Sequence, residues 1–574
     1  MYAHPVKKTL GLTALYFIII IGIFVLQFRS ESVISKSIGL LRYTLVKTDA
    51  KGKTPGLKNS LKISFRGLIL KMDNETPAVI TRTGKDTEQH ITLISYTDAS
   101  PSSCTFTFSD KVSLTCSVTG TSDNPGLILQ AEMPEDIESV TIPYTTSKGY
   151  TFNSKRPGQA VIETKDRKFT ALASNITDTA ITLTNAKPSL AYTVLNENKS
   201  FSYDTVSSLA LAGSEVYTQT VKKFNDTLTA AFTSAVQNNT TITEKSVIAY
   251  VAAMSENGQF IQAINSVPDS FKKGTKRTFL SAPYFDTLAK MHPSLQMQMD
   301  NFRSMVSTAL DKKTCDVFAF SMLSDYMLQN STSANVRSLL QMASSLSDTD
   351  YSIDAVYGIL TVYAQLSAAG SPLADILSPA ADKTLQIIAQ QCTLDNGRIV
   401  LTAKDTPISV PQAVETGAAL VRYGSVKKDD RYTACGRLII NSYLTDMSSL
   451  DLFALSDIYP SLNTDNTYYP HFALLSRDGQ KTVWAWTCAS SVQYTDNGGT
   501  STITIDFPQG FTHYLYICGI DPFIRIQIYE MDFRTDPRFE TYNSSGYVYL
   551  SDSHTLLLKS RHKSQLETVR LFHN

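Results

Sequence analysis

The chain has 574 residues, of which 43% are hydrophobic and 18% are charged. This length predicts about three domains, and the hydrophobic content excludes a disordered chain. Lys+Arg and Asp+Glu both number 52. The sequence therefore lacks the excess of positive charge that phosphate binding needs, and nucleic acid is not an expected partner.

An uncharged apolar segment at residues 10–28 follows a short flank at residues 1–9. As a helix it would be about 28 Å long, which is close to the hydrocarbon thickness of a bilayer. A cleaved signal peptide has a shorter apolar core of about 7–15 residues. The segment therefore predicts an uncleaved, single-pass transmembrane anchor in contact with the lipid bilayer.

The location of the remaining chain depends on weaker signals. Lys7 and Lys8 precede the apolar segment and favour a cytoplasmic N-terminus, whereas Arg29 and Lys36 follow it. The remainder is rich in Ser, Thr and Asn and contains little charge. We therefore expect a membrane protein whose large folded part is periplasmic or extracellular.

The pattern after the anchor changes twice along the chain. A stalk is expected at residues 29–57. Short β-branched and aromatic runs between turn signals then predict an antiparallel β-sandwich at residues 58–203. From residue 204 to 445 apolar residues recur at intervals of three and four, which predicts α-helices packed in antiparallel pairs. Strand patterns return at residues 446–574 and predict a second, sandwich-like β domain.

Part of the helical region is similar to a known architecture. The motif-bearing segments are residues 415–424 (ETGAALVRYG), 429–432 (DDRY) and 435–440 (CGRLII). They resemble one helix pair of the (α/α) toroids in polysaccharide lyases and glycoside hydrolases, and the order sandwich, helices, sandwich is also similar to such enzymes. The close match covers fewer than about thirty residues, and a fold alone does not carry function.

The resemblance implies where catalytic residues would be sought. Lyases of this kind use a Tyr and a His on a uronic acid, and glycosidases use two carboxylates. The best Tyr/His group here is Tyr468, Tyr469 and His471, in a loop after the helical region. Packing of these aromatic residues at a domain interface is the alternative, and we favour it.

A second candidate group contains charged residues between aromatic ones near the C-terminus. Arg525, Tyr529 and Arg534 belong to it. Aromatic rings with polar neighbours suit sugar stacking and hydroxyl binding. They equally suit a salt-bridged domain interface; the sequence does not separate the two interpretations, and we lean to the interface.

Cys104 and Cys116 flank a predicted turn at residues 109–111 at equal distances. They would lie opposite each other across a hairpin, where a disulfide can form; two separate core thiols are the alternative.

No metal or cofactor is expected, because no nucleotide-binding loop, zinc pattern or EF-hand loop occurs. Asp350 is expected to cap a helix rather than to bind a cation.

The sequence thus favours a non-catalytic protein that binds glycan or serves as a scaffold in the cell envelope, with a polysaccharide or an envelope protein as its partner. A polysaccharide lyase or glycoside hydrolase acting on an acidic or complex polysaccharide is the alternative.

Overall fold

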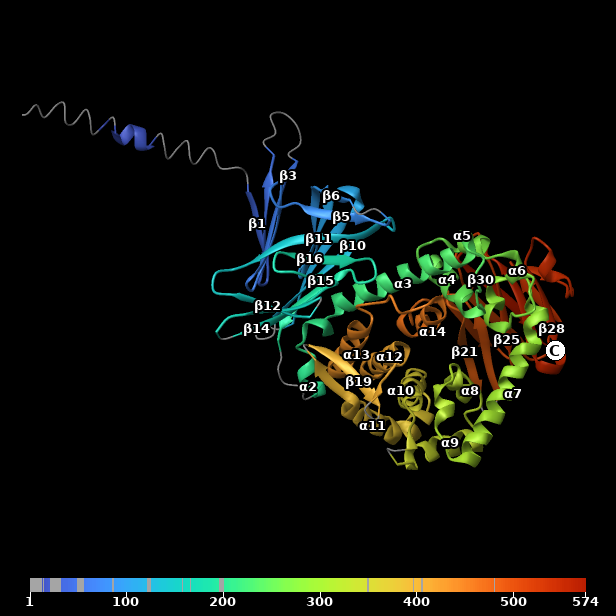
Figure 1. Cartoon of the computed structure of the whole chain (residues 1–574). Coiled ribbons are helices and arrows are strands. Elements are labelled where there is room, and N and C mark those ends of the chain that lie inside the picture. The colour runs from blue at the N-terminus through green and yellow to red at the C-terminus, as the bar shows by residue number, and fades with distance from the viewer. Residues whose placement is uncertain are drawn as a thin grey trace, which may run out of the picture. The chain divides into compact units, whose positions relative to one another are not determined.

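The structure is a computed structural model of the whole chain (Figure 1). It describes residues 13, 15–20, 33–48, 56–84, 87–120, 125–156, 158–165, 167–195, 201–347, 350–395, 397–403, 406–478 and 481–573. Their contacts define two compact units. Unit 1 comprises Met1–Glu197 with Ser208–Leu211, and unit 2 comprises Asn198–Ser207 with Ala212–Asn574.

The predicted transmembrane helix at residues 10–28 requires a correction. A helix needs roughly 20 apolar residues to cross a bilayer, and none within the described ranges is long and apolar enough. In that segment Thr13 and residues 15–20 are helical, and the other positions lie outside the described residues. The single-pass membrane location and the signal anchor were therefore wrong expectations, and no described helix supports the periplasmic or extracellular placement that was expected with them.

Unit 1 contains two antiparallel sheets. The first has the strand order β1-β2-β3-β4-β11-β16-β15, with β5 paired to β11 and β6 paired to β5. Its strands are β1 (Val33–Ile38), β2 (Leu41–Lys47), β3 (Leu57–Phe65), β4 (Leu68–Asp73), β5 (Ala78–Arg82), β6 (Glu88–Ile91), β11 (Ile137–Thr146), β15 (Asn175–Ile176) and β16 (Ala180–Thr184).

The second sheet has the order β12-β13-β14-β17-β10-β9-β8-β7. It consists of β7 (Leu93–Ser100), β8 (Ser103–Phe108), β9 (Ser113–Gly120), β10 (Pro125–Glu132), β12 (Thr151–Arg156), β13 (Gln159–Glu163), β14 (Lys168–Leu172) and β17 (Ser189–Val194), with the 3₁₀ turn η1 (Ser109–Lys111) joining β8 to β9.

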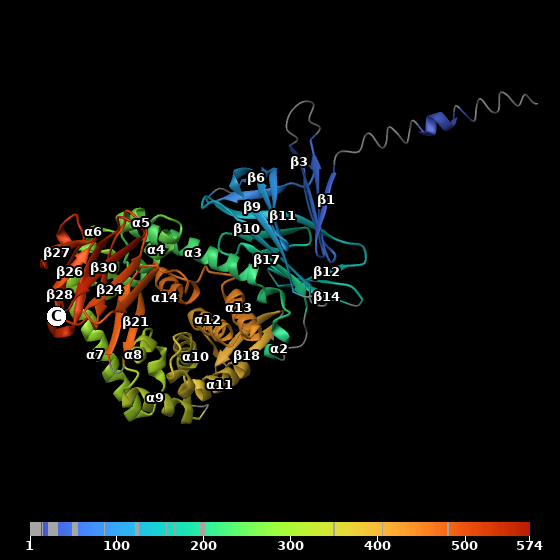
Figure 2. The same ribbon diagram turned by 180° about the vertical axis from the view of Figure 1, so that it is seen from behind.

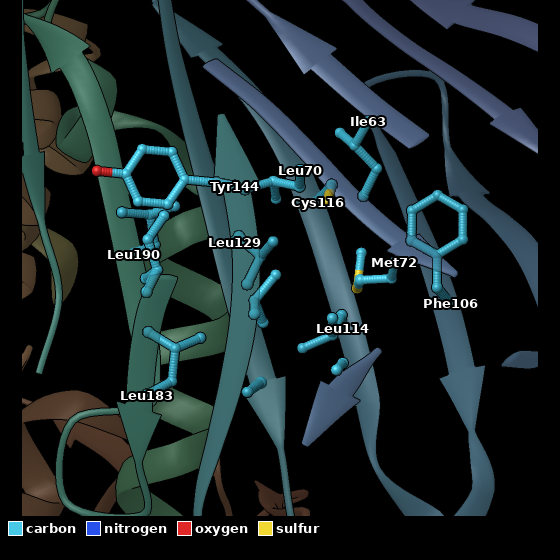
Figure 3. Packing of buried hydrophobic residues seen from close by; sticks show 14 of the residues in the cluster. Ile63, Leu70, Met72, Phe106, Leu114, Cys116, Leu129, Tyr144, Leu183 and Leu190 are labelled. Atoms are coloured by element: carbon cyan, nitrogen blue, oxygen red, sulfur yellow. The ribbon is translucent and has the colours of Figure 1, made fainter. Parts of the chain in front are cut away.

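One hydrophobic core joins the two sheets of unit 1. Every second residue of a strand points inward, so Ile63 and Leu70 of the first sheet meet Phe106 and Leu129 of the second (Figure 3). All four side chains are buried. The unit is therefore a sandwich of two packed antiparallel sheets.

Unit 2 begins with helices. They are α2 (Tyr203–Val206), α3 (Ser214–Gln237), α4 (Glu244–Glu256), α5 (Phe260–Ser266), α6 (Asp269–Lys272), α7 (Leu288–Lys312), α8 (Leu323–Gln329), α9 (Ala334–Ser345), α10 (Ile353–Ala368), α11 (Leu373–Gln391), α12 (Val410–Lys427), α13 (Asp430–Tyr443) and α14 (Leu452–Leu462), with 3₁₀ turns η2 (Ala210–Ala212), η3 (Phe279–Tyr284) and η4 (Asp316–Ala319). A small sheet, β18 (Cys392–Asp395), β19 (Arg398–Ala403) and β20 (Thr406–Pro407), separates α11 from α12.

The helix pair α12–α13 contains the residues on which the resemblance depends. Its glycines allow the two backbones to touch. A Cβ on Gly436 would lie 2.3 Å from the carbonyl oxygen of Gly417, and a Cβ on Gly424 would lie 2.4 Å from Thr433 Oγ1. These residues therefore serve close helix packing.

Two five-stranded antiparallel sheets close the chain. One, in the order β21-β22-β25-β29-β28, contains β21 (His471–Asp478), β22 (Lys481–Thr487), β25 (Thr512–Cys518), β28 (Gly546–Leu550) and β29 (Thr555–Arg561). The other, in the order β23-β24-β30-β26-β27, contains β23 (Ser491–Asp496), β24 (Thr500–Asp506), β26 (Arg525–Ile528), β27 (Met531–Phe533) and β30 (Leu566–Phe572); η6 (Phe539–Thr541) and η7 (Ser551–Ser553) are short turns.

These two sheets form a layered arrangement with the helices. Leu515 and Ile517 of the first sheet share a core with Ile503 and Val569 of the second. On its other face the first sheet packs Trp486 and its neighbours against η3 and α7. The second sheet therefore has one face in the core and one face that points away from it.

Candidate functional site

The outward face of the sheet β23-β24-β30-β26-β27 is a polar surface formed by regular structure in unit 2. Ile503, Ile526 and Val569 point inward and are buried, so the alternate residues of the same strands point outward. We call these side chains the outer face; they are Ser491, Gln493, Thr495, Thr500, Thr502, Thr504, Asp506, Arg525, Gln527, Asp532, Leu566, Thr568, Arg570 and Phe572. The strands β24, β30, β26 and β27 are labelled in the view from behind (Figure 2).

Strand register arranges the outer face in rows. One row crosses all five strands through Thr495, Thr502, Arg570, Gln527 and Asp532. Neighbouring strands are roughly 4.8 Å apart, so this row extends over about 19 Å.

A second, parallel row lies two residues further along the strands. It contains Gln493, Thr504 and Thr568. Hydroxyl, amide and guanidinium groups thus stand at regular spacing.

Most of these polar groups have no partner among the described residues. Within the ranges that the structure describes, the side chains of Thr502, Thr504, Thr568 and Arg570 form no hydrogen bond or ion pair. Gln527 is an exception, because its Nε2 donates to Asp532 Oδ1 at 3.0 Å. The outer face therefore offers donors and acceptors that a ligand can use.

A shallow cavity of about 170 Å³ lies at one end of the outer face; its lining residues are Gln527, Tyr529, Glu530, Glu567, Thr568 and Arg570. Tyr529 and Glu530 form the turn between β26 and β27, with φ angles of 55° and 60°. Positive φ in both central residues is typical of the tight turns that join two antiparallel strands. The local backbone thus fixes Tyr529 beside Arg570.

The three predicted ligand-binding residues have different surroundings in the structure. Tyr529 lines the cavity, and its hydroxyl donates to the backbone carbonyl oxygen of Arg561. Arg525 is on the outer face, with its guanidinium carbon 3.8 Å from the centroid of the Phe572 ring. Arg534 is exposed just after β27. Gln527, Thr568 and Arg570 were not singled out in the sequence, although their alternation with buried residues is a visible signal.

The three predicted catalytic residues are half-buried and contact other residues of unit 2. Tyr469 stacks on Tyr459 with ring centroids 5.8 Å apart. The Tyr468 ring lies 6.1 Å from that of Phe507. His471 Nδ1 is 2.9 Å from the carbonyl oxygen of Tyr469. Burial lowers the pKa of His471 and raises that of Tyr469. These contacts are those of packing residues; catalysis by these residues stays a prediction.

A second cavity, of about 250 Å³, is lined by Thr243, Glu244, Lys245, Leu280, Phe453 and Asp457. Its charged groups already have partners. Lys245 Nζ lies 2.7 Å from Asp457 Oδ1, and the Glu244 carboxylate accepts hydrogen bonds from the backbone N–H groups of Thr278 and Ser281. The outer face is therefore the stronger candidate.

The predicted hairpin of unit 1 places its two cysteines as expected. Cys104 in β8 pairs with Cys116 in β9, and both side chains are buried. Both are free thiols in the structure, and the disulfide between them stays a prediction. Phe108 N–H donates to Val112 O in the same hairpin, so alternation makes the cysteines a hydrogen-bonded pair, whose Cβ atoms are further apart than in a non-hydrogen-bonded pair.

Among the described residues, no group of three or more His, Cys, Asp or Glu side chains is arranged to hold a metal ion. Comparisons with protein-family models, with curated proteins and with solved structures found no match to this chain. The resemblance to toroid enzymes therefore stays a prediction that depends on the sequence motif alone.

Proposed function

We propose that this protein is a non-catalytic glycan-binding protein and that the glycan lies on the outer face. The observation that carries the proposal is a set of polar side chains in register that have no partner in the described part of the chain; Thr502, Arg570 and Thr568 are its centre. Sugar rings present hydroxyls that both donate and accept, as do threonine hydroxyls.

The geometry of the outer face supports this class of ligand over a protein partner. The centres of protein–protein interfaces are rich in aromatic and apolar residues, whereas the middle of this face is formed by hydroxyls, an amide and a guanidinium. Phe572 and Tyr529 stand near its ends, where Arg525 and Lys563 lie over their rings. A long row of small polar groups suits an extended chain of sugar units.

The test is binding of the full chain to a panel of neutral and acidic polysaccharides by affinity electrophoresis and calorimetry. We expect retention by at least one polysaccharide and a weaker affinity for the double variant Gln527→Ala/Thr568→Ala. Thr97→Ala is the matched control, because Thr97 is an exposed threonine in strand β7 of unit 1; it should bind like the wild type.

Two results would overturn the proposal. One is no retention by any polysaccharide of the panel, and the other is equal affinity of the wild type and the double variant. Cleavage of a polysaccharide that disappears in His471→Ala would replace it with the alternative, a polysaccharide lyase or glycoside hydrolase. Incubations followed by size-exclusion chromatography of the polysaccharide measure this.

A further inference from the structure

Arg570 occupies the centre of the long row of the outer face. Thr502 is its neighbour on β24, and Gln527 is its neighbour on β26. Its side chain is half-buried and lines the shallow cavity beside Tyr529. A guanidinium presents five N–H donors in a plane, and here the row supplies it with neutral neighbours.

The other arginine of the outer face is in a different situation. Arg525 Nη1 lies 3.6 Å from Asp532 Oδ1, and its guanidinium carbon lies 3.8 Å from the Phe572 ring centroid. Its charge is thus matched by a neighbour within the sheet. Arg570 has no such acid among the described residues, so the two arginines differ in whether a partner is already provided.

The acidic residues near Arg570 are directed elsewhere. The Oε1 atom of Glu567 accepts from the backbone N–H groups of Lys563 and Ser564, at 2.6 and 2.8 Å. Asp532 is engaged with Arg525 and Gln527. Glu530 is exposed at the tip of the hairpin, where water screens its charge.

We propose that the glycan bound by the outer face carries carboxylate groups, as in a uronic acid polymer, and that Arg570 binds one of them. The inference depends on the proposed function and names its ligand class. A planar guanidinium can donate two parallel hydrogen bonds to one carboxylate, and such charge-assisted bonds are stronger than bonds between neutral groups. The threonines and Gln527 then bind the hydroxyls of the same and neighbouring sugar units.

The test compares two probes that differ only in the carboxylate. Polygalacturonate and its carboxyl-reduced form are titrated into the full chain by calorimetry. We expect the wild type to bind polygalacturonate about tenfold or more tightly than the reduced polymer. Arg570→Gln should lose the preference for the carboxylate, so that the variant binds polygalacturonate and the reduced polymer with the same affinity.

The control is Arg337→Gln, which removes an equal charge from the exposed surface of helix α9 and should leave both affinities unchanged. Thermal unfolding of each variant verifies that the fold is retained. Equal binding of both polymers by the wild type, or unchanged polygalacturonate binding by Arg570→Gln, overturns the carboxylate inference and leaves glycan binding in place. Absence of binding to the whole polysaccharide panel overturns the proposed function itself.

Discussion

Residues 468–471 and the hairpin formed by β26 and β27 contain similar residue types, and tyrosines of both pack against the same core. They differ in that the hairpin also carries outward polar side chains in register with the neighbouring strand. In the first segment Tyr468 and Tyr469 contact other aromatic rings inside unit 2. In the second, Arg525 and Tyr529 lie beside polar groups that face away from the core. Aromatic and charged residues in a loop therefore do not identify a site; the side chains around them decide.

The largest expected effect tests the packing of the tyrosines at residues 468–471. Tyr469→Ala removes a ring that stacks on Tyr459 and should lower the free energy of unfolding by about 3–5 kcal/mol. Chemical denaturation measures it. Tyr542→Ala is the control, since that ring is 42% exposed, and it should change stability by less than about 0.5 kcal/mol. A small loss for Tyr469→Ala would contradict the packing interpretation.

The second prediction tests another closely packed part of unit 2, the contact between helices α12 and α13. Gly436→Ala would put a methyl group 2.3 Å from Gly417 O, and overpacking of this kind costs about 1–3 kcal/mol. Gly499→Ala is the matched control, because a Cβ there meets nothing within 4 Å. If both variants have the same melting temperature, the two helix backbones do not touch as described.

The sequence predicts where strands and helices occur better than it predicts which elements pack or pair with one another. Alternating residues correctly indicated strands such as β9, and the cysteine spacing correctly predicted that Cys104 and Cys116 lie opposite each other across the hairpin of β8 and β9. It missed the hairpin of β18 and β19, because a short pair of strands between two helices leaves little periodicity to detect.

Spacing in the sequence does not identify helix caps, for a related reason. Thr241 and Glu244 have the spacing of a capping box, but Thr243 and Ser246 form it. Glu244 instead holds Thr278 and Ser281, more than thirty residues away. Similarly, Ser352 and not Asp350 caps α10. Spacing alone cannot show which of several polar residues will form hydrogen bonds with an element that is distant in the sequence.

The candidate site depends on distant pairing in the same way. Thr502, Arg570 and Gln527 come from three strands and meet only through register. Their alternation within each strand is visible in the sequence. Which of the two sheet faces stays open is decided by the other sheet and the helices, and no local pattern encodes that.

The third prediction concerns how the stability of the protein depends on pH through the buried side chain of His513. His513 is fully buried between Phe507 and His562, with ring centroids 4.2 and 5.3 Å away. Burial first, and then the charge of His562, hold its pKa well below the ordinary value of 6.5. The unfolded chain therefore binds a proton that the folded chain does not, so this contribution to stability is present above about pH 6.5 and is lost as the pH falls below it.

Denaturant titrations from pH 7.5 down to pH 5 measure this effect. For the wild type the free energy of unfolding should fall by up to about 1.4 kcal/mol per pH unit for each such histidine. His513→Leu should fall less steeply over the same range. The prediction fails if both proteins show the same slope.

The smallest expected effect on stability tests the outer face. Thr568→Val keeps the β-branched shape and removes a hydroxyl that has no partner among the described residues, so the free energy of unfolding should stay within about 0.5 kcal/mol. The matched variant is Thr487→Val in β22, whose buried hydroxyl accepts from Ala489 N–H at 3.0 Å. Leaving that donor unsatisfied should cost about 1–3 kcal/mol.

The same threonine-to-valine change should thus have different effects on the outer face and in the buried strand β22. At position 568 it should weaken polysaccharide binding while stability stays constant, since the hydroxyl bonds only to water or ligand. At position 487 it should lower stability while binding by folded protein stays constant. Equal stability losses at the two positions would mean that the outer face is covered in the folded protein, and a covered face cannot be the glycan site.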